Sequence, residues 1–196
     1  MEMKPSQLVA IIHEFHQQGW SQATSTNYSM RLEQNVLISR SGIDKGDFTQ
    51  ADFMTVDLEG NPIEPIDATP SAETLLHTMV YQMSDANVVL HTHSVNATVL
   101  SLKNSHEGAL YFTGYEMLKG LPGVEDHQQT VGLPIFDNSQ DMAELSQDIA
   151  DFWHENPEMS GFILAGHGLY TWGKDLKSAK RHIEVYEFLF ECMMKK

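Results

Sequence analysis

The chain of 196 residues has an apolar fraction of 41% and a formal net charge of −15. The apolar fraction excludes an intrinsically disordered chain, and the acidic balance argues against nucleic acid as a partner because phosphate backbones attract basic surfaces. The one cysteine, Cys192, cannot form an internal disulfide, which fits a reducing compartment. With no signal-like leader and no apolar run long enough to span a membrane, we expect one cytoplasmic domain over residues 1–196 that does not contact membranes.

Hydrophobic periodicity divides the chain into helices and strands. In the first part of the chain we expect a helix over 6–18, two strands joined by a turn within 27–39, a glycine-bounded loop over 39–46, a strand over 53–58 and a loop over 62–70. A helix capped by Ser71 and running to Met83, a strand over 87–93 and a short helix over 94–102 should follow. In the last part we expect a strand near 133–136, a helix over 139–153, a strand–turn–strand unit over 162–172 and a terminal helix over 175–194. Most strands are hairpin neighbours and helices separate some of them. This order predicts an α/β fold, a three-layer αβα sandwich with a central, mainly antiparallel sheet.

Two of the ten histidines, His91 and His93, stand two residues apart at the end of one predicted strand. Residues with this spacing project from the same face of a strand, so one ion can bridge them. The preceding apolar run Val88–Leu90 indicates a buried strand, and two neutral imidazoles at its end suit Zn²⁺. The pair is equally compatible with two packed histidines that bind nothing.

A catalytic zinc ion needs a third protein ligand, and His167 is the candidate. It lies in the sequence AGHG, where Gly166 and Gly168 leave space around the imidazole, although a histidine in a tight glycine turn would look the same. His77, on the helix after Ser71, either faces the site or packs. The other histidines lie in polar or helix-surface settings and need no ligand role: His13, His16, His106, His127, His154 and His182.

Six segments, in order along nearly the whole chain, resemble the class II aldolase/adducin-like family: ATSTNYSMR, SRSGIDKG, TPSAETLLH, VVLHTHS, TGYEMLKG and LAGHGLYTWG. Any one of them is a weak signal, but six in register indicate the family. The segments EMLKG and GHGLYTWG favour a dehydratase of this family over its sugar-phosphate aldolases.

The resemblance implies an αβα sandwich and a homotetramer with active sites near the subunit interfaces. It also implies one Zn²⁺ per subunit, held by His91, His93 and His167, and a small sugar phosphate as substrate. Three imidazoles accept several divalent transition metals, so the residues alone leave the identity of the ion open.

Two glutamates are candidates for the acid/base. Glu73 lies in the first turn of the helix after Ser71, where a carboxylate also complements the helix dipole. The aldolases of the family use the matching glutamate as acid/base. Glu116, in GYEMLKG, has an equally simple interpretation as a surface residue, but the dehydratase-like pattern carries the acid/base here. We therefore expect Glu116 to be the main catalyst and Glu73 to line the site.

An anionic substrate on so acidic a chain requires a local positive pocket. The loop around Ser41 and Gly42 offers backbone N–H groups and a hydroxyl, and glycine permits close approach of a phosphate. Asn27 and Ser71 match family positions that bind the substrate phosphate. The loop lacks the spacing of a P-loop, so nucleotide binding is not indicated.

Lys119 is the cation that we expect at the phosphate, as a point charge. Arg40 and Lys45 could contribute, but charged residues in loops are more often simply solvated. We therefore leave both outside the predicted site.

Two other functions remain open. A sugar-phosphate aldolase or epimerase on the same fold would keep the three histidines and depend on Glu73. A noncatalytic adducin-like interaction module would need no metal, and the presence of all three histidines argues against it.

Overall fold

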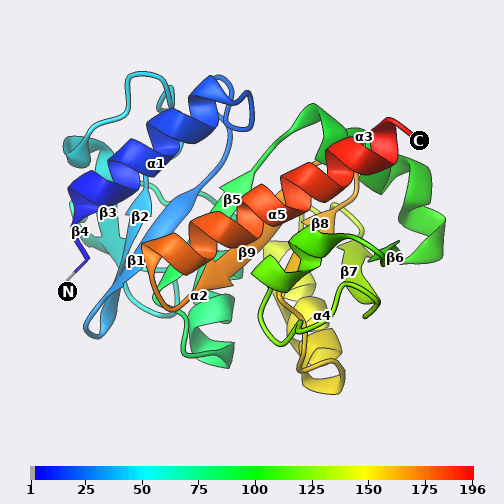
Figure 1. Ribbon diagram of the computed structural model, residues 1–196. Coiled ribbons are helices and arrows are strands. Elements are labelled where there is room, and N and C mark those ends of the chain that lie inside the picture. The colour runs from blue at the N-terminus through cyan, green and yellow to red at the C-terminus, as the bar shows by residue number, and fades with distance from the viewer. Residues whose placement is uncertain (1–2) are drawn as a thin grey trace.

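The computed structural model describes residues 3–196 (Figure 1). It contains five α-helices, α1 to α5, over Pro5–Gln17, Thr74–Met83, Val95–Asn104, Met142–Glu155 and Leu176–Met194. Its strands, β1 to β9, cover Tyr28–Leu32, Asn35–Ser39, Phe53–Val56, Pro62–Glu64, Val88–Thr92, Ala109–Phe112, Val131–Phe136, Gly161–Leu164 and Leu169–Gly173. Three short 3-10 helices, η1 to η3, cover Gln50–Asp52, Ser105–Glu107 and Glu116–Gly120.

The nine strands form one sheet in the order β4-β3-β2-β1-β5-β9-β8-β7-β6. All neighbouring pairs are antiparallel except β7 and β8, which are parallel. The sheet is therefore mixed but mainly antiparallel, as its hairpin-rich sequence predicts.

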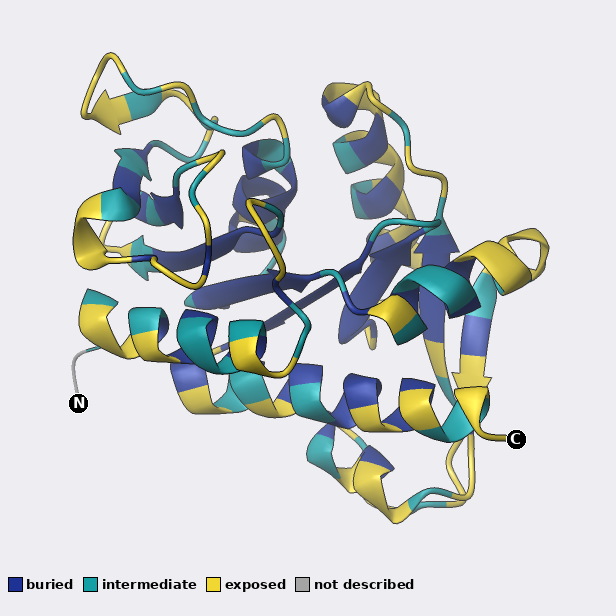
Figure 2. Cartoon of the chain, turned by 90° about the horizontal axis from the view of Figure 1, so that it is seen from above, coloured by how far each residue is buried: buried dark blue, intermediate teal, exposed yellow. Residues whose placement is uncertain are grey.

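Helices cover both faces of this sheet, and a separate hydrophobic core fills each side. One core joins the sheet to apolar residues of α1, α3 and α5, and the other joins it to apolar residues of α2 and α4. Figure 2 shows the buried strands running between these two helical layers. The expected three-layer αβα sandwich is confirmed.

The middle of the sheet holds the strand that matters most for the site. All five residues of β5 are buried, because β1 and β9 flank its edges and helices cover its faces. His91 pairs in register with Tyr170 and Thr92 with Leu169. His91 and His93, the two histidines identified by their spacing in the sequence, therefore lie at the end of β5, where the chain leaves the sheet.

Three local expectations were wrong. Residues 62–64 form β4 instead of a loop, and residues 109–112 form β6 where no element was expected. Both are short strands at the two ends of the sheet, where few residues are available to show alternation. Ser71 does not cap α2: its carbonyl and hydroxyl oxygens accept bonds from the N–H groups of Thr74 and Glu73, and Glu73 is the residue that precedes the helix.

No helix within residues 3–196 has the length and apolar character needed to cross a membrane.

Candidate metal centre and active site

His91 and His93 converge at the end of β5. Their Nε2 atoms lie 2.6 Å apart, shorter than an ordinary N–H···N contact and typical of donor atoms that face a common point. His91 is fully buried, and its ring stacks on that of Tyr170 with centroids 3.8 Å apart. Its Nδ1 lies 3.0 Å from the carbonyl oxygen of Leu169, which can only accept, so Nδ1 carries the proton and Nε2 has a free lone pair.

Electrostatics keep both rings neutral. Burial lowers the pKa of His91 well below its ordinary value, and the neighbouring imidazoles of His93 and His167 lower it further. Burial also lowers the pKa of His93 to about 4, again with help from His167. Neutral imidazoles are the form that ligates a metal.

His167 reaches the same point from the turn between β8 and β9. The adjacent Gly168 is necessary, because a Cβ there would lie 2.2 Å from the carbonyl oxygen of Thr92 and 2.7 Å from Cδ2 of His93. The turn also passes through Gly166, whose φ of +68° favours glycine. The side-chain oxygen of Asn138 lies 3.1 Å from His167 Nδ1 and holds the ring with Nε2 toward the other histidines.

Glu73 adds a carboxylate to the three imidazoles. Its Oε1 lies 2.9 Å from Nε2 of His167 and 3.9 Å from Nε2 of His91. Burial raises the pKa of this carboxyl, but the hydrogen bond and the Coulombic interaction with His167, together with the interactions with His93 and His77, outweigh burial, so the pKa lies below its ordinary value. The side chain is therefore an anion aimed at the histidines.

The four residues together form a cluster able to hold a metal ion. One potential ligand atom from each lies within 4.8 Å of the others. In tetrahedral zinc sites, bonds of roughly 2.0–2.1 Å place neighbouring ligand atoms about 3.3 Å apart. The measured separations of 2.6 to 3.9 Å bracket this value, and the set of three imidazoles and one carboxylate suits a divalent transition metal. The sequence suggested the three histidines for this role but placed Glu73 only among the residues that line the site.

Two further histidines are buried without joining the cluster. His77 is packed edge-on against Tyr170, and its Nδ1 lies 2.8 Å from the hydroxyl of Ser29. Burial lowers the pKa of His77 to about 4. His182 was expected in a polar or surface setting, but it is only 5% exposed, because its α5 position faces the sheet and its Nδ1 donates to the carbonyl of Trp172.

Two of the five predicted phosphate residues, Asn27 and Ser71, lie next to the cluster. Asn27 is buried, its carbonyl accepts the N–H of His91 at 3.0 Å, and its side-chain Oδ1 has no hydrogen-bond partner among the described residues. Ser71 stands just before Glu73 in the turn that leads into α2.

Ser41 and Gly42 are exposed in the loop that follows β2. Gly42 has a φ of +78°, which requires the conformational freedom of glycine. The Ser39 hydroxyl accepts the N–H of Tyr28 at 3.0 Å and so holds the start of this loop beside Asn27. In the same loop Lys45 was expected to be solvated but is fully buried.

The remaining predicted residues, Glu116 and Lys119, lie outside the cluster on η3. The Lys119 ammonium donates to Glu116 Oε1 at 2.7 Å, and the Glu116 side chain is 73% exposed. This hydrogen bond and the charge of Lys119 lower the pKa of Glu116, so the carboxylate is ionised. The structure thus presents the pair at the surface of the protein.

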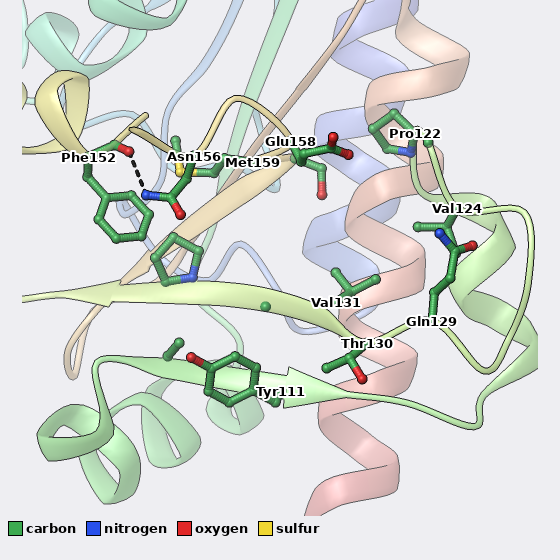
Figure 3. Close-up of a pocket in the computed structure, with 15 residues that line it drawn as sticks. Tyr111, Pro122, Val124, Gln129, Thr130, Val131, Phe152, Asn156, Glu158 and Met159 are labelled. Carbon is green, nitrogen blue, oxygen red and sulfur yellow. Dashed lines mark hydrogen bonds between the residues drawn. The ribbon is translucent and has the colours of Figure 1, made fainter. Parts of the chain in front are cut away.

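A pocket of about 280 Å³ lies elsewhere, beside the strands β6 and β7 (Figure 3). Tyr111, Val131 and Phe152 are among its lining residues, and Asn156 closes one side by donating to the Phe152 carbonyl at 2.9 Å. None of the ten residues predicted for the site lines this pocket.

Fold and cluster together define a three-layer α/β protein with a histidine–carboxylate site able to hold a metal ion. The chain belongs to the class II aldolase family: the family model described as Class II Aldolase and Adducin N-terminal domain matches residues 6–194. The resemblance seen in the six sequence segments is confirmed.

The chain is similar to curated proteins in sequence and to solved structures in fold. The methylthioribulose-1-phosphate dehydratase of Marinobacter nauticus is 46% identical over 179 residues, which cover 90% of this chain and 86% of that protein. The protein of the same name from Picosynechococcus sp. is 46% identical over 194 residues, 97% of this chain and 91% of that protein.

Among solved structures, the L-fuculose-1-phosphate aldolase of Thermus thermophilus has a TM-score of 0.76 at 24% identity and covers 97% of this chain and 95% of its own. YgbL of Klebsiella pneumoniae, a putative aldolase/epimerase/decarboxylase, has a TM-score of 0.81 at 22% identity and covers 99% of this chain and 91% of its own. At these identities the solved structures establish the fold.

Proposed function

We propose that the protein is a zinc-dependent hydro-lyase that dehydrates 5-methylthioribulose 1-phosphate to 2,3-diketo-5-methylthiopentyl 1-phosphate, a step of methionine salvage. The observation that carries the proposal is the cluster of Glu73, His91, His93 and His167 in a chain 46% identical to proteins named methylthioribulose-1-phosphate dehydratase. We assign zinc because neutral imidazoles with one carboxylate form a typical site for this ion. When bound, the ion supplies a Lewis acid for the C2 carbonyl of the substrate, which makes the proton on C3 more acidic.

The residues of the chain divide the remaining work. Glu116 takes the C3 proton as a carboxylate, the form that its lowered pKa favours. The electron pair of the broken C–H bond forms the C3–C4 double bond, and the C4 hydroxyl leaves as water with a proton returned by the Glu116 carboxylic acid. The enol that results becomes the 2,3-diketone when a proton adds at C4. Asn27, Ser41, Gly42, Ser71 and Lys119 hold the phosphate in this scheme.

The exposed position of Glu116 fits the homotetramer that we propose as the working form. A carboxylate that lies at the subunit surface, outside its own metal cluster, can serve the site of a neighbouring subunit. Mixed oligomers test this arrangement. Subunits with His93→Ala and subunits with Glu116→Gln should each be inactive alone and regain activity after co-refolding, because some sites then combine an intact cluster with an intact Glu116. No recovery from verified mixed oligomers would place Glu116 in the site of its own subunit.

We further propose that the single domain works in the cytoplasm, where the unpaired Cys192 meets reducing conditions.

The deciding experiment is incubation of zinc-loaded protein with methylthioribulose 1-phosphate in D₂O, followed by proton NMR. Dehydration predicts an intact five-carbon skeleton with deuterium at C4. Dihydroxyacetone phosphate and a methylthio aldehyde would instead show cleavage of the C3–C4 bond, which is the aldolase reaction. Glu116→Gln should abolish dehydration while zinc content stays at the wild-type level; retention of most activity would move the acid/base role to Glu73.

A further inference from the structure

The side-chain ammonium of Lys45 lies inside the protein and has no ionic partner within residues 3–196. Its side chain is fully buried in the loop between β2 and η1, and its Nζ donates one hydrogen bond, to the carbonyl of Ile43 at 2.9 Å. Nζ also lies 5.6 Å from the ring centroid of Phe48. Within residues 3–196 no carboxylate oxygen lies within 4.0 Å of it. An ammonium group has three donors, so two N–H groups remain available for a ligand.

Among the residues that the structure describes, the fold provides no ion pair that offsets the burial of this charge. A buried charge without a partner destabilises a protein, and burial accordingly lowers the pKa of Lys45 to about 8. Lysine is almost never fully buried unless it is paired. Groups that are costly to keep inside a protein are concentrated at functional sites.

Backbone hydrogen bonds tie Lys45 to the metal cluster through the segment 20–27. The carbonyls of Trp20 and Asn27 accept the N–H groups of His93 and His91 at 2.8 and 3.0 Å, and the carbonyl of Ala23, between them, accepts the N–H of Lys45 at 3.1 Å. Ala23 has a φ of +54°, which is uncommon for a residue other than glycine. One short, specifically shaped segment therefore places the Lys45 backbone beside the strand that carries the two ligands.

The electrostatic couplings agree with this placement. Asp44 and Asp52, and to a smaller extent Glu73 of the cluster, raise the pKa of Lys45 against the effect of burial, and Lys45 in turn contributes to lowering the pKa of His93. Lys119, the other cation proposed at the phosphate, shares its charge with Glu116, to which it donates at the surface.

We propose that Lys45 is a phosphate-binding residue of the active site and supplies the buried positive charge for the phosphate monoester of the substrate. The nature of the phosphate ester rests on the proposed function. Lys45 stands in the same loop as Ser41 and Gly42, and segment 20–27 joins it to Asn27. It therefore explains how a chain of net charge −15 accepts an anion: Lys45 adds a positive charge inside the protein.

The test compares Lys45→Met with Lys45→Arg, and uses Lys177→Met, at an exposed lysine of α5, as the matched control for the loss of one charge. Three quantities are measured on zinc-loaded protein: the Kd of inorganic phosphate by calorimetry, the KM for methylthioribulose 1-phosphate and the midpoint of thermal unfolding. Loss of a hydrogen-bonded charge predicts an increase of about 10- to 100-fold in both Kd and KM for Lys45→Met. Lys45→Arg should show a much smaller increase, and Lys177→Met none.

Thermal unfolding separates ligand binding from a structural role. If Lys45 is kept for phosphate, Lys45→Met leaves the midpoint unchanged or raises it, because an unpaired buried charge is removed. A lower midpoint with unchanged Kd and KM would assign Lys45 to the folding of its loop and overturn the proposal. Lys45→Gln, which loses the charge but can still donate to Ile43, serves as the second variant if Lys45→Met does not fold, and the same changes in Kd and KM are expected of it.

The two proposals fail separately. A wild-type protein that dehydrates the substrate, with a Kd and KM insensitive to the Lys45 substitutions, keeps the function and loses the phosphate role of Lys45. A wild-type protein that binds inorganic phosphate through Lys45 but leaves methylthioribulose 1-phosphate unchanged keeps the anion site and overturns the proposed substrate.

Discussion

Oε1 of Glu73 lies 2.9 Å from Nε2 of His167, so the residue that precedes α2 touches the turn between β8 and β9. This contact puts Glu73 among the potential metal ligands. It also separates Glu73 from Glu116, which the sequence placed in the same site as a second carboxylate. The two glutamates therefore have different expected phenotypes.

Replacement of Glu73 by glutamine should weaken metal binding. The change removes the only carboxylate of the cluster and leaves three imidazoles. We expect the affinity for zinc to fall by more than the roughly 10- to 100-fold that is typical of changes outside the ligand shell. Calorimetric titration of metal-free protein with zinc measures the effect, and Glu155→Gln, at an exposed residue that ends α4, is the control. Unchanged zinc affinity would remove Glu73 from the ligand set.

Replacement of Asn138 by alanine should weaken the metal site through His167. The Asn138 amide oxygen lies 3.1 Å from His167 Nδ1, and without it the ring loses the contact that fixes its orientation. Outer partners of metal-binding histidines are typically worth about 10- to 100-fold in metal affinity. Zinc affinity is again the measurement, with Asn156→Ala as control, since the Asn156 side chain donates to the Phe152 carbonyl of α4 and does not belong to the cluster. Equal affinities for Asn138→Ala and wild type would show that packing alone orients His167.

A single methyl group at Gly168 should damage both the fold and the metal site. The new Cβ would lie 2.2 Å from the carbonyl oxygen of Thr92, so β5 and the β8–β9 turn would have to move apart. We expect Gly168→Ala to lower the free energy of unfolding by about 1–3 kcal/mol or more and to lower bound zinc. Denaturant unfolding and elemental analysis measure the two effects. Gly132→Ala is the control, because its Cβ would meet only the Tyr111 side chain, at 3.3 Å; normal zinc content in Gly168→Ala would contradict the prediction.

Glu187 should make the stability of the protein fall as the pH rises. This α5 residue is only 3% exposed, and burial raises its pKa to about 8 from an ordinary 4.5, against the opposing effect of the Ser94 and Thr92 hydroxyls. Between pH 4.5 and 8 the folded chain holds a proton that the unfolded chain has lost, so the Glu187 contribution to stability decreases by at most about 1.4 kcal/mol per pH unit.

The comparison of Glu187→Gln with wild type isolates this contribution. Glutamine cannot ionise, so the stability of the variant relative to wild type should increase from pH 5 to pH 8.5 and change little above that. Urea unfolding at a series of pH values measures the difference. A difference that stays constant with pH would mean that the folded protein gives Glu187 an ordinary pKa.

Most of the fold could be predicted from the sequence because the apolar residues of most helices and strands recur at a regular spacing. α1 and α5 have apolar positions at helical spacing, and β5 is a continuous buried run. β4 and β6 could not be predicted because each is very short and lies at an end of the sheet. The cap of α2 was misplaced because Ser71 has the residue type of a cap but uses its oxygens in the preceding turn.

Some residues of the site could also be predicted from the sequence, and others are revealed only by the tertiary structure. The pair His91 and His93 shows its geometry in its spacing, and His167 is marked by its glycines. The contact of Glu73 with His167 depends on tertiary structure, which a helix-start position does not reveal. Lys45 is the clearest case: a lysine in a polar loop is normally solvated, and only the packing of segment 20–27 against β5 shows that this one is buried.

The cluster draws on three distant stretches of the chain: the start of α2, the end of β5 and the turn before β9. An ion bound there is a non-covalent cross-link that closes most of the central sequence into loops, and it stabilises only the folded chain. Removal of the ion by a chelator should therefore weaken the pairing of β5 with β9 in the middle of the sheet. Proteases should then cleave the chain at the centre of the sheet and not at its edge strands. A cell short of metal would then clear the empty protein faster than the loaded one.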